Sequence, residues 1–215
     1  MLVQSPSKIF KADFAVWKQE NSCRINEIVS DKDDAGILRK VTEIVLDENG
    51  SCILKPEESS IIMILTLYGK IQINGFEKIV SSRDVFTLKT AESLTLNIIN
   101  TLSDEKADLL IFEMKSQKQE NSFSIEELQI NQRNMLIPIS GNLELPNFIG
   151  LYEGRMEQEY SLYHSESQIF GMVVNGAFEF QNRLMETRDA VLLQEIETLE
   201  FEALSENALI IFLEI

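Results

Sequence analysis

The chain is built of short segments in which apolar and polar residues alternate, separated by turn signals. The segments 94–98 (LTLNI) and 199–203 (LEFEA) show this alternation, which places apolar side chains on one face of a half-buried β-strand. Asn74-Gly75 follows the apolar segment 71–73 and precedes 76–80, and this dipeptide favours the tight turn of a hairpin. The pattern therefore predicts an antiparallel, all-β protein.

A helical period is nearly absent, with one exception in the segment 116–135. Ser124 and Glu127 have the Ser-x-x-Glu spacing of a capping box, and Leu128 and Ile130 follow them. This spacing is typical of a helix N-terminus. We therefore expect one short helix in this otherwise polar, linker-like segment.

Four short sequence segments occur twice along the chain in the same order, and the gaps between them agree to within a few residues. The first copy is 67–69 (LYG), 83–88 (RDVFTL), 92–94 (ESL) and 109–114 (LLIFEM), and the second is 174–176 (VNG), 188–193 (RDAVLL), 197–199 (ETL) and 209–215 (LIIFLEI). Repetition of this kind indicates duplicated domains. We expect an N-terminal barrel with an N-terminal arm over 1–115, a linker over 116–135 and a C-terminal barrel over 136–215.

The first copy resembles the first cupin motif, in which Gly, five residues, His-x-His, three or four residues, Glu, six residues and Gly follow one another. Gly50 and Gly69 keep the spacing of the two glycines. The three metal-ligand positions between them hold Pro56, Glu58 and Ile62.

The second cupin motif places a further His eleven residues after a turn glycine. In the first copy Arg83 stands in place of that glycine, and Leu94 occupies the His position. In the second copy Leu199 occupies the same position, and Ile169 stands where the Glu ligand belongs. The His-x-His positions of the second copy fall on Leu162 and His164 with a four-residue gap, or on Tyr163 and Ser165 with a three-residue gap.

Over most of the chain the plan resembles that of the pirin-like and quercetinase-like bicupins. The resemblance implies two tandem antiparallel cupin (jelly-roll) barrels. Members with an intact first-barrel site bind iron-like metals, and some oxidise flavonols. A transition-metal site needs three or four converging N, O or S ligands. At most one ligand remains in either barrel, so we expect no metal and no cofactor here.

Each of three residues at or near the metal-ligand positions can be interpreted in two ways. Glu58 is either a polar anchor in the first barrel or a solvated carboxylate at its mouth, because a buried, unpaired carboxylate would be costly. His164, the only histidine, is either a remnant ligand and acid-base group or a surface residue. Cys52 shares strand parity with Glu58 and is either a nucleophile or a small core residue.

The charge of the chain narrows the choice of partners. The sequence has 35 acidic and 19 basic residues, a formal net charge of −16, and no basic cluster. Such a chain repels phosphate backbones, so nucleic-acid binding is not expected. Neither a signal peptide nor a membrane span is recognisable, and two cysteines in such a chain are typical of reduced thiols. We expect a cytoplasmic protein.

The leading hypothesis is a metal-free, non-catalytic, pirin-like bicupin that binds a small molecule or a protein. The alternative is a quercetinase-like dioxygenase with a non-standard metal site, using ligands such as Glu43, Glu57 or Cys52. A homodimer formed through sheet edges is a further possibility.

Overall fold

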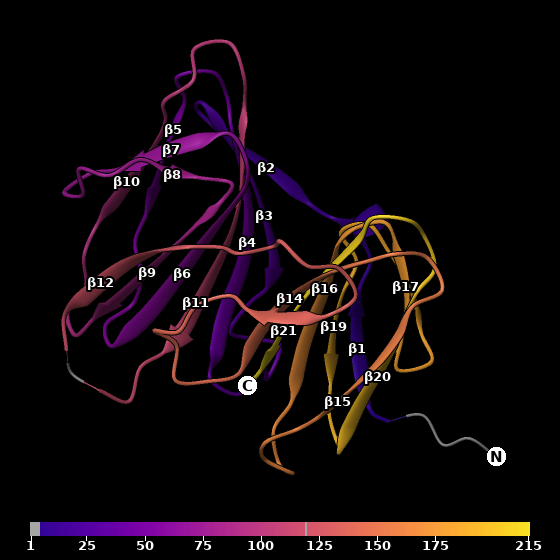
Figure 1. The fold of residues 1–215 in the computed structure, drawn as a ribbon. Coiled ribbons are helices and arrows are strands. Elements are labelled where there is room, and N and C mark those ends of the chain that lie inside the picture. The colour runs from indigo at the N-terminus through magenta and orange to yellow at the C-terminus, as the bar shows by residue number, and fades with distance from the viewer. Residues whose placement is uncertain (1–4, 119) are drawn as a thin grey trace. The chain divides into compact units, whose positions relative to one another are not determined.

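The computed structural model describes residues 5–118 and 120–215, and Figure 1 shows their arrangement. Within these residues the chain forms strands β1 to β21 and one three-residue 3₁₀ helix, η1 (Ala12–Phe14). None of the described segments forms a helix of the length and apolarity needed to cross a bilayer. The prediction of an all-β fold is confirmed.

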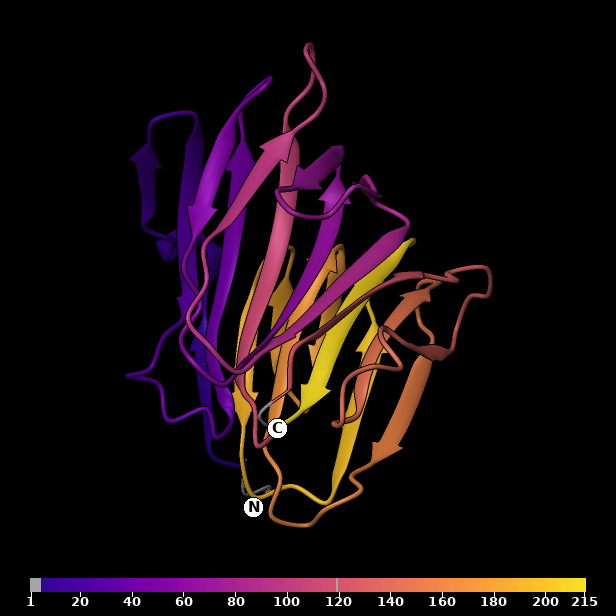
Figure 2. The same cartoon turned by 90° about the vertical axis from the view of Figure 1, so that its left-hand side faces the viewer.

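The chain divides into two compact units. The N-terminal unit is Val16–Leu128, and the C-terminal unit joins the described residues up to Ala15 with Gln129–Ile215. Figure 2 shows the long neighbouring strands of each unit side by side. Each unit consists of a large and a small antiparallel sheet around its own apolar core.

The N-terminal unit contains a seven-stranded and a four-stranded sheet. The large sheet has the order β12 (Ser122–Glu127), β9 (Asp84–Thr90), β6 (Ser60–Tyr68), β11 (Ala107–Lys115), β4 (Leu38–Leu46), β3 (Cys23–Val29), β2 (Trp17–Glu20). The small sheet has the order β5 (Ser51–Leu54), β10 (Leu96–Asn100), β7 (Lys70–Ile73), β8 (Val80–Ser81).

The C-terminal unit contains a six-stranded and a four-stranded sheet. The large sheet has the order β1 (Ser7–Phe10), β19 (Ala190–Leu193), β16 (Ile169–Asn175), β21 (Ala208–Glu214), β14 (Asn147–Tyr152), β13 (Leu136–Pro138). The small sheet has the order β15 (Glu157–Ser161), β20 (Thr198–Ala203), β17 (Ala177–Phe180), β18 (Leu184–Glu186).

The sheet topology confirms the duplication. Strands β4 to β11 of the N-terminal unit recur as β14 to β21 of the C-terminal unit, with the same neighbours in each sheet. Gly69 and Gly176 directly follow the matching strands β6 and β16, with φ angles of +88° and +80°. A Cβ atom on either glycine would lie about 3 Å from Ala107 or Ala208, so both positions also lack room for a side chain.

The central strand β6 explains the apolar run 61–65. Ile62 and Ile64 point into the core between the two sheets, and the alternating residues Met63 and Leu65 are also buried. A strand buried on both faces reads as a continuous apolar run instead of an alternating one.

The prediction of a short helix in the linker is wrong. The residues that carry the capping-box spacing form strand β12, which pairs with β9 from Ser122↔Lys89 to Glu127↔Asp84. Ile125 packs against the core of the N-terminal unit, and Phe123 contacts Phe76 with 4.7 Å between ring centroids. The edge of β9 offers six paired positions, which outweighs one local capping signal.

The N-terminal arm was expected to belong to the first barrel, but its strand β1 completes the C-terminal unit. β1 pairs with β19 from Ser7↔Leu193 to Phe10↔Ala190, at the edge that β12 occupies in the other unit. Arg183 donates to the Ser7 hydroxyl, and Asp189 accepts a hydrogen bond from Ala12 N at 2.8 Å. Lys11 forms an ion pair with Asp189.

Candidate functional site

The former metal-ligand positions of the N-terminal unit are largely filled by apolar side chains. Ile62 on β6 is 0% exposed and belongs to the core cluster. Leu94, in the loop before β10, is half-buried and packs against the same cluster. Pro56 is buried in the loop after β5. Three of the four positions therefore offer no metal-binding atom.

Glu58, the only acidic residue at these positions, lies exposed on the loop before β6. Its backbone carbonyl accepts a hydrogen bond of 3.0 Å from Arg39 Nη1. The neighbouring Glu57 carboxylate lies 3.5 Å from Arg39 Nε. This placement matches the interpretation of Glu58 as a solvated carboxylate, since water reaches its side chain.

In the C-terminal unit, apolar side chains also occupy most of the former metal-ligand positions. Ile169 on β16 and Leu199 on β20 are both 0% exposed within its core cluster, and Leu162 packs against that cluster. His164 is exposed on the loop before β16. One exposed imidazole beside buried aliphatic side chains cannot hold a transition metal against water.

Sequence reasoning missed a buried carboxylate next to each former Glu position. Glu113 on β11 is the register partner of Ile62, and Glu214 on β21 is the register partner of Ile169. Both glutamates are buried, at 4% and 2% exposure. Their signal in the sequence was a glutamate inside each apolar run, at 109–114 and 209–215.

Both carboxylates accept hydrogen bonds from backbone amides of the loop that carries the former His-x-His positions, and Glu113 also accepts one from the first residue of β6. Glu113 Oε1 accepts from Glu57 N at 2.8 Å and from Ser60 Oγ at 3.1 Å. Glu214 accepts from Tyr163 N at 3.0 Å and from His164 N at 2.9 Å. A buried carboxylate that accepts such bonds has its desolvation cost offset.

These bonds are compatible with both alignments of the second copy. Glu57 is the middle residue of the His-x-His positions in the N-terminal unit, and its amide binds Glu113. Tyr163 is the middle residue with the four-residue gap, and its amide binds Glu214. His164 is the middle residue with the three-residue gap, and its amide binds Glu214 as well. The second unit therefore keeps the hydrogen bond of the first in either alignment.

Tyr160 completes the network around Glu214. Its hydroxyl donates to Glu214 Oε2 at 2.7 Å. Burial first, and then this hydrogen bond to a carboxylate, raise the pKa of Tyr160 above its ordinary value of 10.0. The phenol therefore stays protonated at neutral pH and serves as a donor that holds the carboxylate.

The non-standard ligands of the alternative hypothesis do not converge. Cys52 lies in the core cluster of the N-terminal unit, whereas Glu57 is exposed on a loop. Glu43 alternates along β4 with Ile44 and therefore points away from that core. In residues 5–118 and 120–215 no group of three or more His, Cys, Asp or Glu side chains is arranged to hold a metal ion. The residues do not fit the metal centre that the fold family implies.

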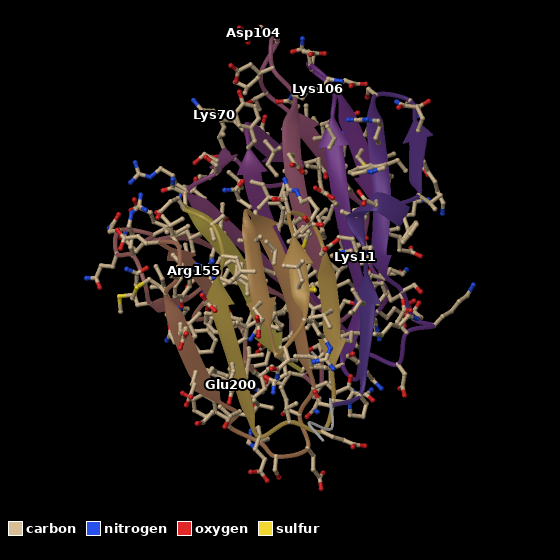
Figure 3. The ribbon with its side chains drawn as sticks, turned by 90° about the vertical axis from the view of Figure 1, so that its right-hand side faces the viewer. Lys11, Lys70, Asp104, Lys106, Arg155 and Glu200 are labelled. Atoms are coloured by element: carbon tan, nitrogen blue, oxygen red, sulfur yellow. The ribbon has the colours of Figure 1, made fainter. Side chains whose placement is uncertain are left out.

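A hollow of about 520 Å³ lies on the C-terminal unit, on the outer face of its small sheet. Strand parity places this face opposite the core, because Leu199 and Phe201 point inward while Glu200 and Glu202 point outward. Figure 3 labels Arg155 and Glu200 on this unit. The lining residues are Glu157, Gln158, Glu159, Glu179, Asn182, Glu200, Phe201 and Glu202.

Register places the five glutamates of this hollow in two cross-strand rows. Glu202 is paired with Glu157 on one side and with Glu179 on the other, and Glu200 is paired with Glu159. Like charges directly opposite one another destabilise a sheet. Arg155 Nη1 lies 3.3 Å from Glu202 Oε1 and offsets part of this charge.

No protein-family model and no curated protein matches the sequence. Solved structures do match. YhhW from Escherichia coli superposes with a TM-score of 0.84 at 12% identity, over 98% of this chain and 98% of that chain. The bacterial pirin YhhW in complex with nickel(II), also from Escherichia coli, gives a TM-score of 0.82 at 12% identity, over 97% and 99%. The chain has a pirin-like bicupin fold.

The pirin-like fold is shared with an enzyme as well. A quercetin 2,3-dioxygenase from Acinetobacter baumannii superposes with a TM-score of 0.77 at 8% identity, over 96% of this chain and 85% of that chain. At such identities the likeness concerns the fold, so the chemistry of this bicupin must be argued from its own residues.

Proposed function

We propose that this chain is a metal-free, non-catalytic, pirin-like bicupin that acts as a protein-interaction module. The observation that carries the proposal is the pair of fully buried isoleucines, Ile62 and Ile169, at the position of the glutamate ligand in each barrel. With Leu94 and Leu199 at the fourth-ligand position, apolar volume replaces the metal cage in both units.

The filled interiors favour a protein partner over a small molecule. Small-molecule sites are concave, mostly apolar pockets with a few polar groups that fix the ligand. In this chain the described hollow is instead acidic and lies outside the barrel, on the outer face of β15, β20 and β17. A surface of this kind suits an extended partner that brings positive charge.

The chemistry of the hollow supports a partner segment rich in Lys and Arg. Cationic side chains would relieve the repulsion between the cross-strand glutamate pairs. The same charge disfavours nucleic acid, whose phosphates would be repelled.

Binding of a fluorescent oligolysine peptide tests this proposal. We compare the unaltered chain with a variant that carries Glu→Gln changes at the five hollow positions 157, 159, 179, 200 and 202. We expect the affinity of the variant for the peptide to fall by at least about tenfold, because five negative charges are lost from one surface. The variant should fold, since these changes relieve like-charge repulsion.

A charge-matched control separates the hollow from net charge. The control carries Glu→Gln at the exposed positions 48, 77, 92, 166 and 206, which removes the same number of charges elsewhere. We expect it to keep most of its affinity for the peptide. Equal loss in the two variants would mean that binding follows net charge alone, and the hollow would not be an interaction site.

A further inference from the structure

Cys23 and Cys52 are 29 positions apart in the sequence but meet in the core of the N-terminal unit. Cys23 begins β3 in the large sheet, and Cys52 lies on β5 at the edge of the small sheet. Both belong to the same core cluster and are 2% and 5% exposed. Each thiol shifts the pKa of the other, as close neighbours do. The pair therefore joins the two sheets.

The residues that precede the two cysteines hold this arrangement in place. Ser51 N donates to Ser22 Oγ at 2.9 Å, and Ser22 Oγ donates to Ser51 O at 3.2 Å. Asp47 N donates to Ser22 O at 2.9 Å, which fixes the chain between the two strands. The two backbones are therefore tied to one another immediately beside the cysteines.

We propose that Cys23 and Cys52 form a reversible intramolecular disulfide, an oxidative modification site that links β3 to β5. The oxidant is a peroxide. The Cys23 thiolate attacks one peroxide oxygen, so an S–O bond forms, the O–O bond breaks and hydroxide leaves. The Cys52 sulfur then attacks Cys23 sulfur, so the S–S bond forms and the S–O bond breaks. The two thiol protons end on the departing oxygens, and two thiols and one hydrogen peroxide become one disulfide and two waters.

Cys23 is the thiol that reacts first. Burial raises the pKa of both thiols, and that of Cys52 to about 12. The hydrogen bond from Cys52 works in the opposite direction on Cys23, because it stabilises the Cys23 thiolate. The Cys23 thiol donates a hydrogen bond of 3.2 Å to the carbonyl oxygen of Glu20, and this bond favours the protonated form. The carboxylates of Glu20 and Asp47 raise the pKa of Cys23 further by their negative charge.

The raised pKa values of the thiols predict how the rate of oxidation depends on pH. Only the thiolate attacks peroxide. At pH values below the pKa of Cys23, the rate of oxidation should therefore rise by up to tenfold for each unit by which the pH increases. Burial should make the reaction slow at neutral pH. Once formed, the disulfide closes the loop between the two cysteines and restricts the unfolded chain, so the midpoint of thermal unfolding should rise.

The test is oxidation of the whole protein by hydrogen peroxide at pH 7, 8 and 9, followed by mass spectrometry of a non-reducing digest. We expect a cross-linked peptide pair containing Cys23 and Cys52, lighter by two hydrogen atoms than the sum of the two peptides. It should form faster at higher pH. The unfolding midpoint should rise with it, and dithiothreitol should reverse both changes.

Cys23→Ser and Cys52→Ser variants are the controls, and neither should show the rise in the unfolding midpoint. The digest of the unaltered protein needs no variant, so the proposal remains testable if a variant fails to fold. Three results would overturn it: sulfinic or sulfonic acid on one cysteine without a cross-link, a disulfide between two chains, or thiols that stay reduced throughout at pH 9.

Discussion

Ile62 and Ile169 lie where the cupin motif carries its glutamate ligand, and each contributes to the core of its own unit. A glutamate at either position would need a cation or buried donors to offset its desolvation. An isoleucine instead gains from burial. The exchange therefore removes a ligand and stabilises the barrel at the same place.

Truncation of these isoleucines measures that stabilisation. We expect Ile62→Ala and Ile169→Ala each to lower the free energy of unfolding by about 2–5 kcal/mol, because each deletes a fully buried side chain and leaves a cavity. Leu94→Ala should cost less, since Leu94 is half-buried. Urea denaturation followed by fluorescence gives these values.

Ile53→Ala is the matched control within the N-terminal unit. Ile53 is 62% exposed on β5, so its truncation should change the free energy of unfolding by less than about 0.5 kcal/mol. A loss as small as this for Ile62→Ala would mean that the side chain lines an open cavity. That result would favour a small-molecule ligand inside the barrel.

The sequence indicated the apolar replacements but not the glutamates that accompany them. Ile62, Leu94, Ile169 and Leu199 could be located by counting from glycines and turn residues. Glu113 and Glu214 stand inside apolar runs, but in a chain with 35 acidic residues a carboxylate is ordinarily solvated, so this signal was passed over. Their burial depends on amide groups of a loop about 50 residues away, which no local pattern reveals.

At the scale of elements, the edge strands β1 and β12 were the hardest to predict. The strands of the repeats carry their own alternation of apolar and polar residues, so their type was visible in the sequence. The partners of the two connecting segments were not, because β1 pairs with residues at least 180 positions away. For β12, a capping-box spacing indicated a helix, and the free edge of β9 decided otherwise.

Asp189 tests the attachment of β1. It is 2% exposed and accepts hydrogen bonds from Ala12 N at 2.8 Å and Glu186 N at 2.9 Å, in addition to its ion pair with Lys11. We expect Asp189→Asn to lower the free energy of unfolding of the C-terminal unit by about 1–3 kcal/mol. Hydrogen exchange of the β1 and β19 amides should then become faster.

The pKa of Lys11 predicts the direction in which hydrogen exchange of the β1 amides changes with pH. The hydrogen bond to Asp189 raises the pKa of Lys11 above its ordinary value of 10.5. The ion pair therefore stabilises the arm fully below pH 10.5, and this contribution is lost as the pH rises through the folded-state pKa. Above pH 10.5, protection of β1 should therefore weaken as the pH rises.

Asp84→Asn is the control for Asp189→Asn. Asp84 is the equivalent turn residue of the N-terminal unit and accepts from Ser81 N at 3.0 Å, but it has no part in holding β1. Its replacement should leave the exchange of β1 unchanged. If Asp189→Asn also left β1 protected, the backbone ladder with β19 alone would hold the arm.

At the scale of the whole molecule, the net charge could be predicted from the sequence, but the grouping of the charges on one surface could not. The sequence predicted an acidic protein, and the alternation in 199–203 predicted outward-facing Glu200 and Glu202. The cross-strand partners Glu157, Glu159 and Glu179 became neighbours of these residues only through the register of β15, β20 and β17. A sheet register of this kind is not readable from a single sequence.

Metal content tests the central claim most directly. The protein is purified without chelators, incubated with excess nickel(II) or iron(II), passed through a desalting column and measured by inductively coupled plasma mass spectrometry. We predict that no metal is retained in stoichiometric amount, because buried aliphatic side chains occupy the ligand positions of both barrels. One equivalent of metal per chain would contradict the account, and its loss in Glu58→Ala would identify the first barrel as its site.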